Sequence, residues 1–161
     1  MDETTNFHKI IFDKGKWQPK QPQFAQHPAV CVTLEGARAY ADWKHMSLPT
    51  QEQWLLAANP EGESEFVGPT ANQAWHRANA TSKTHEVKQK NANSRKIYDL
   101  YGNVAELLAP GSANNPKAPA ALGGHFDSDF KDLSAPITNT ELNNLIQQGK
   151  TGFRCVKKLE K

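Results

Sequence analysis

The sequence lacks a long hydrophobic run and has almost no cysteine. No stretch of its 161 residues approaches the roughly 20 apolar residues that a membrane-spanning helix needs. The first residues also lack the apolar segment of a signal peptide, although this leaves the compartment open. The two cysteines, Cys31 and Cys155, permit one disulfide, but their apolar, strand-like surroundings favour buried free thiols.

An excess of charge of one sign is also absent. The chain carries 19 Lys and Arg against 17 Asp and Glu, a net charge of +2, which gives no electrostatic basis for binding nucleic acid. Hydrophobic residues make up only 37%, with ten glycines and ten prolines. These values predict one polar, loop-rich domain with many turns.

Familiar catalytic motifs are missing as well. The sequence contains no G-x-S-x-G, P-loop or C-x-x-C motif. The histidines are His8, His27, His45, His76, His85 and His125. They form no H-x-x-x-H pair and no His–carboxylate motif, so the sequence predicts neither an iron site nor any catalytic residue.

Two helix starts are well marked. Thr33 precedes a helix predicted from Leu34 to about Lys44, and Thr50 with Gln53 forms a T-x-x-Q capping box for a helix that reaches about Ala58. Other predicted elements are a strand over 28–32, a short helix over 141–148 and a closing strand over 152–156.

The most informative stretch runs from Tyr98 to Glu106 (YDLYGNVAE). It places the carboxylates of Asp99 and Glu106 on either side of a Gly-Asn turn. Such an arrangement can surround a hard cation with oxygen ligands.

Four further segments accompany this stretch: His27–Trp43, Leu48–Trp54, Gly123–Gly124 and Gly152–Arg154. Together with Asn93–Glu106, they resemble the formylglycine-generating enzyme (sulfatase-modifying factor) family. The resemblance implies an α+β, C-type-lectin-like fold with two helices, short antiparallel strands and extensive loops. We expect residues 27–161 to form this domain, and residues 1–26 to be an N-terminal extension or shortened first strands.

The resemblance also implies a calcium site. Its ligands would be the side chains of Asp99 and Glu106 and the carbonyls of Gly102 and Val104. All four supply oxygen, the donor that Ca²⁺ prefers. We expect calcium as the cofactor, and neither copper nor iron.

Members of the family that oxidise a cysteine substrate bind copper through two cysteines after the Gly-Gly motif. Ser128 and Leu133 occupy these positions, so we expect no formylglycine-generating activity. His125, Asp127 and Asp129 lie nearby and are candidate ligand-binding residues.

The sequence therefore predicts a non-catalytic, calcium-stabilised, lectin-like domain that binds a protein or other ligand. Recognition would use the loops at 109–121 and 125–151 and exposed parts of 60–96. Two alternatives stay open: a divergent metal-dependent oxidoreductase with a site rebuilt around His125, and a structural subunit of a larger bacterial assembly. The family resemblance also permits an extracytoplasmic location.

Overall fold

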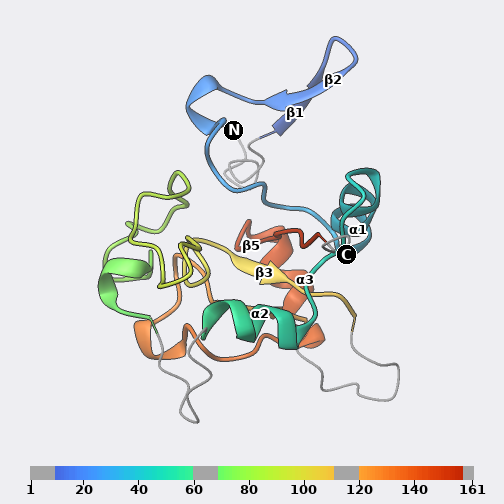
Figure 1. The fold of residues 1–161 in the computed structure, drawn as a ribbon. Helices are drawn as coiled ribbons and strands as arrows, with labels where there is room; N and C mark the ends of the chain where they lie inside the picture. Colours follow the sequence, from blue (N-terminus) through green and yellow to red (C-terminus); the bar gives the residue numbers. More distant parts are fainter. Residues whose placement is uncertain (1–9, 60–68, 111–119, 158–161) are drawn as a thin grey trace.

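The computed structural model describes residues 10–59, 69–110 and 120–157. Its α-helices are α1 (Leu34–Trp43), α2 (Gln51–Ala58) and α3 (Asn139–Gln147). Its strands are β1 (Ile10–Asp13), β2 (Lys16–Pro19), β3 (Ala105–Leu107), β4 (Ala121–Leu122) and β5 (Thr151–Gly152). Short 3-10 turns are found at Pro22–Phe24, Ala71–Gln73 and Phe130–Asp132. The predicted α+β class is confirmed, with much of the described chain in loops (Figure 1).

The helix starts follow the local signals in the sequence. The Thr33 hydroxyl accepts a hydrogen bond from the backbone N–H of Gly36 at 3.1 Å. At α2, the Gln53 N–H donates to the Thr50 hydroxyl at 3.2 Å, and the Thr50 N–H donates to the Gln53 side chain at 2.9 Å. Both caps are confirmed because the groups involved lie within one turn of each other.

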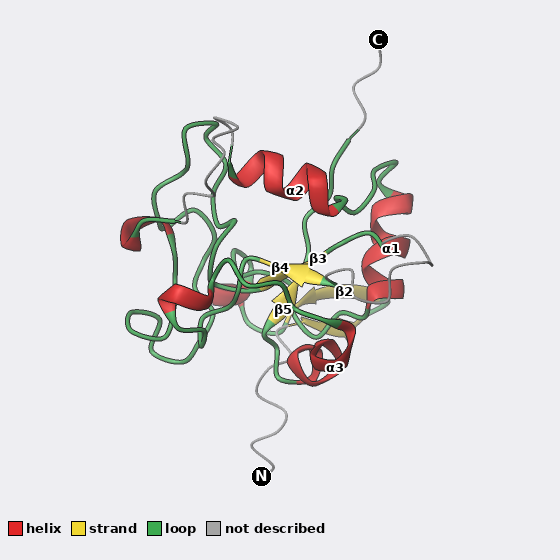
Figure 2. Cartoon of the chain, turned by 90° about the horizontal axis from the view of Figure 1, so that it is seen from below, coloured by secondary structure: helices red, strands yellow, loops and turns green. Residues whose placement is uncertain are grey.

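The strands form two separate sheets. Strands β1 and β2 make an antiparallel hairpin, and the second sheet has the order β4-β3-β5. In that sheet β4 is antiparallel to β3, whereas β5 is parallel to it. The expectation of antiparallel strands is therefore corrected for β5. Figure 2 shows this sheet at the centre of the molecule, close to the three helices.

Two predicted strands are wrong in whole or in part. Residues 28–32 form no strand, because Pro28 has no N–H to donate and Cys31 adopts a φ of 59°, far from extended backbone. Of the predicted closing strand, Gly152 belongs to β5 and Val156 makes an isolated bridge to Ser47. The residues between them lack ladder partners.

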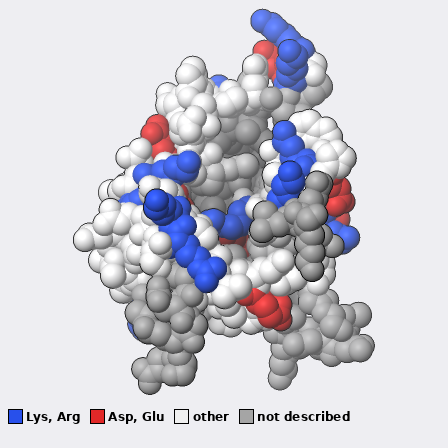
Figure 3. All heavy atoms as spheres, in the orientation of Figure 1, with Lys and Arg blue, Asp and Glu red and all other residues white. Residues whose placement is uncertain are grey.

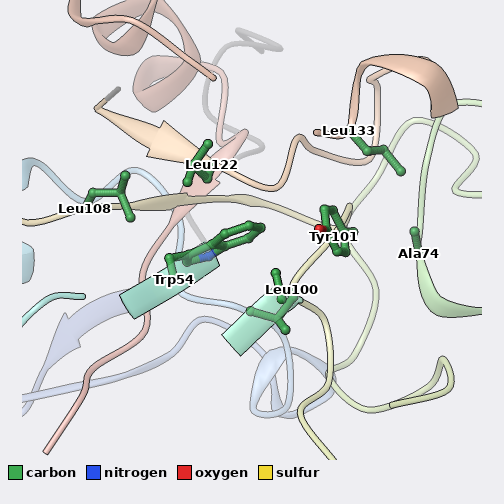
Figure 4. Packing of buried hydrophobic residues seen from close by; sticks show 8 residues of the cluster. Trp54, Ala74, Leu100, Tyr101, Leu108, Leu122 and Leu133 are labelled. Atoms are coloured by element: carbon green, nitrogen blue, oxygen red, sulfur yellow. The ribbon is translucent and has the colours of Figure 1, made fainter. Parts of the chain in front are cut away.

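Strand β3 separates two hydrophobic clusters. Successive side chains of a strand point to opposite faces, so Ala105 and Leu107 pack with α1 and α3, whereas Leu108 packs with Trp54 of α2. Figure 4 shows the Trp54 ring between Leu108 and Leu122 on one side and Leu100 and Tyr101 on the other. The intervening residue, Glu106, points to the Trp54 side and is also buried. A charged residue is thus held inside the core.

None of the helices in the described ranges combines the length and the apolar character needed to cross a membrane.

Candidate functional site

The carboxylate of Glu106 is the charged centre of the fold. It is only 5% exposed, and β3 fixes its position against α2. Arg154 contacts both of its oxygens, with Nε and Nη2 each at 2.5 Å. The Trp54 indole N–H donates to Oε2 at 2.7 Å. Burial raises the pKa of Glu106, and the hydrogen bonds and charge of Arg154 oppose that rise.

Glu106 and Arg154 form part of the wall of an open pocket of about 410 Å³. Asp99 and Val104, two other predicted calcium ligands, line the same pocket. Asp99 accepts a hydrogen bond from the backbone N–H of Lys88 at 2.7 Å, and burial raises its pKa. The structure therefore gathers three of the four predicted ligands around one cavity.

The donor set around this cavity does not match a calcium ion held through Glu106. Both oxygens of that carboxylate already bond to the Arg154 guanidinium, which is itself a cation. A calcium ion would have to displace Arg154 or rely on Asp99 and backbone carbonyls. In addition, the described part of the chain contains no group of three or more His, Cys, Asp or Glu side chains placed to hold a metal. Calcium binding at these residues stays a prediction.

Gly102, the fourth predicted ligand, has a clear steric role. Its φ is 71°, and a β-carbon at this position would lie 2.1 Å from the carbonyl oxygen of Trp75. That close approach lets Asn103 N–H donate to Trp75 O at 2.8 Å. Only glycine fits such a contact in this backbone conformation.

The two positions implied for copper ligands have other functions. Leu133 is fully buried in the hydrophobic cluster around Trp54. The Ser128 hydroxyl accepts a hydrogen bond from the backbone N–H of His125 at 3.0 Å, closing a tight turn. Both side chains serve packing and turn geometry.

His125, Asp127 and Asp129 do lie together, within a network of two cations. Arg77 contacts Asp129 at 3.0 Å and Asp127 at 3.5 Å, and Lys150 contacts Asp127 at 3.0 Å. The bond from Lys150 lowers the pKa of Asp127. Burial lowers the pKa of His125 to about 4, so its ring is neutral near pH 7. Its Nδ1 accepts from the Asp127 N–H at 3.1 Å.

Sequence reasoning missed the roles of Arg77 and Lys150 in this network. Arg77 lies 50 residues from Asp127 along the chain, and no spacing pattern connects them. The sequence presents Arg154 only within the segment Gly152–Arg154, and nothing in that segment indicates its pairing with Glu106. Both cysteines are free thiols and partly buried, and burial raises the pKa of each.

Comparison with known proteins identifies the family. Residues 5–159 match the family model for the sulfatase-modifying factor enzyme 1-like domain. The chain belongs to this family. The predicted resemblance to the formylglycine-generating enzymes is therefore confirmed.

Individual relatives of this sulfatase-modifying factor domain differ in their names. The serine/threonine-protein kinase pkn1 of Chlamydia pneumoniae is 31% identical over 159 residues, covering 86% of this chain and 25% of that protein. The inactive C-alpha-formylglycine-generating enzyme 2 of Bos taurus is 31% identical over 151 residues, covering 81% of this chain and 50% of its own length. The domain thus spans between a quarter and a half of these curated relatives.

A solved structure shares the fold. The crystal structure of CarF superposes with a TM-score of 0.62 at 20% identity, covering 90% of this chain and 72% of that one. At this identity the likeness concerns the fold alone.

Proposed function

We propose that this sulfatase-modifying factor domain is a non-catalytic binding domain. The observation that carries the proposal is the placement of Leu133, which fills the hydrophobic core where the family resemblance implies a copper-binding thiolate. A leucine offers no ligand, and the hydroxyl of Ser128 is a poor substitute for a thiolate towards copper(I).

Two relatives support this proposal. One is named an inactive formylglycine-generating enzyme. Another is a protein kinase, and the match covers a quarter of the kinase's length. Such a match suits a domain that forms one part of a larger protein. Binding of a protein partner is consistent with both.

We place the recognition surface on the loop after β4. The charged network there mixes acidic and basic groups. The side chains of Arg77 and Asp129 are 56% and 48% exposed, and that of Asp127 is 34% exposed. Because Arg77 joins the two acids to a different loop, the network presents them in a fixed geometry. This group of residues, His125, Asp127 and Asp129 with Arg77, is called the loop surface below.

An activity assay tests the non-catalytic role. The purified chain, loaded with copper(I), would be incubated aerobically with a cysteine-containing peptide and a thiol reductant, and the peptide mass followed over time. We expect no conversion of the cysteine to an aldehyde. Turnover by the wild-type chain that disappears without copper would overturn the proposal.

A further inference from the structure

A patch of aromatic side chains lies exposed on α1. Trp43 is 68% exposed and Tyr40 is 45% exposed. The Tyr40 ring contacts Trp43 at 5.7 Å between centroids and Phe153 at 5.5 Å. Single exposed apolar residues are common on protein surfaces. Three rings in contact form a patch, and exposed patches of this kind mark interaction sites.

Phe153 connects this patch to the pocket described above. It packs against Tyr40 and also lines the 410 Å³ pocket, next to Arg154. Lys88 and Lys96 line the same pocket. Figure 3 shows a face that is hollowed near its centre, with Lys and Arg side chains gathered around the hollow.

Arg154 has bonding capacity left for a ligand. Its Nε and Nη2 make all three hydrogen bonds found for this side chain within residues 10–59, 69–110 and 120–157, to Glu106 and to the Tyr98 carbonyl. The remaining nitrogen, Nη1, carries two further N–H groups. The side chain is 27% exposed and lines the pocket, and we assign the Nη1 edge of the guanidinium to the ligand.

The charges in the pocket favour one class of partner. Glu106 neutralises Arg154, which leaves Lys88 and Lys96 against the single carboxylate of Asp99. The pocket therefore carries an excess of positive charge, but the carboxylate of Asp99 would repel a phosphate dianion. A peptide suits both signs, because an acidic side chain can meet the lysines while backbone N–H groups donate to Asp99.

We propose that the aromatic patch and the Arg154 pocket together form a docking site for a protein segment in which an acidic residue stands beside an apolar one. The acidic side chain enters the pocket, and the apolar side chain packs on Tyr40 and Trp43. Trp, Tyr and Arg are the residues that dominate binding energy at protein interfaces. This site shares no residue with the loop surface and does not depend on it.

A random peptide library displayed on phage, selected on the wild-type chain, tests the proposal. We expect enriched peptides to carry Asp or Glu next to an aromatic or aliphatic residue. The K88E/K96E variant should bind them at least 10-fold more weakly, since two attractive charges become repulsive, and W43A should weaken binding by a similar factor.

Two matched control variants test whether the loss of binding depends on the position of the substituted residues. K14E/K16E makes the same charge change on exposed lysines of the β1–β2 hairpin, and L56A removes an apolar side chain that is 56% exposed on α2. Both should bind like the wild type. Enriched peptides without acidic residues, or with equal affinity for K88E/K96E, would overturn the proposal. So would peptides whose binding is lost only when His125, Asp127 and Asp129 are changed to Ala, because these would map to the loop surface instead.

Discussion

The ion pair between Glu106 and Arg154 gives Glu106 a different role from the one predicted by its sequence motif. By sequence, Glu106 was one of four ligands for a cation. In the structure a cation is present beside it as the guanidinium of Arg154, bonded to both carboxylate oxygens. Taking one partner away would leave a buried charge without compensation, and such changes are among the most destabilising known.

We therefore expect Arg154→Ala to lower the free energy of unfolding by about 3–5 kcal/mol. Urea denaturation of the purified variant would measure this. Arg77→Ala is the matched control: its pairs are solvent-exposed, so its cost should stay below about 1 kcal/mol. Equal losses in the two variants would contradict a special role for the buried pair.

Among the elements, helices were more predictable than strands. The starts of α1 and α2 depend on Thr33, Thr50 and Gln53, whose bonds stay within one turn. The strands depend on partners far along the chain, as when Ala105 of β3 pairs with Thr151 of β5. A pattern of alternating residues cannot give the direction of such a partner, which explains why the parallel pairing was not foreseen.

The parallel bridge between Trp75 and Gly102, just before β3, leads to a prediction about backbone packing. Gly102→Ala would place a β-carbon 2.1 Å from the Trp75 carbonyl oxygen. We expect it to cost about 3 kcal/mol or more, from the combined clash and positive φ. Gly15→Ala is matched in φ, at 77°, but has open space around it, so it should cost only about 1–2 kcal/mol.

Thermal or urea unfolding of both glycine variants would check this expectation. The difference between them isolates the steric term, because the backbone conformation is shared. Similar costs for the two variants would mean that the segments can separate at little expense.

At the scale of the whole molecule, the family and fold class could be predicted and the site could only be predicted in part. Asp99, Val104 and Glu106 line one cavity, because they belong to one short segment, and their role as calcium ligands stays a prediction. The roles of Arg77, Lys150 and Arg154 could not be found, since each depends on contacts between distant loops. Sequence reasoning thus found the acidic side chains but missed the basic side chains that form ion pairs with them.

The response of the whole fold to calcium follows from this balance. Because Arg154 satisfies Glu106, we expect the wild-type melting temperature to be the same in excess calcium and in excess chelator. Arg154→Gln removes the competing charge, so this variant should melt higher in calcium than in chelator, as a ligand selective for the folded state requires. A calcium-dependent rise in the wild type would instead support the site predicted from the sequence.

The placement of Arg154 also has a consequence for synthesis on the ribosome. Glu106 precedes it by 48 residues, and strand β5 lies in the same late segment. At about 5–20 residues per second, translation leaves Glu106 without its cationic partner for roughly 2–10 seconds. During that interval the nascent chain must keep the Glu106 carboxylate hydrated, although the finished fold buries it.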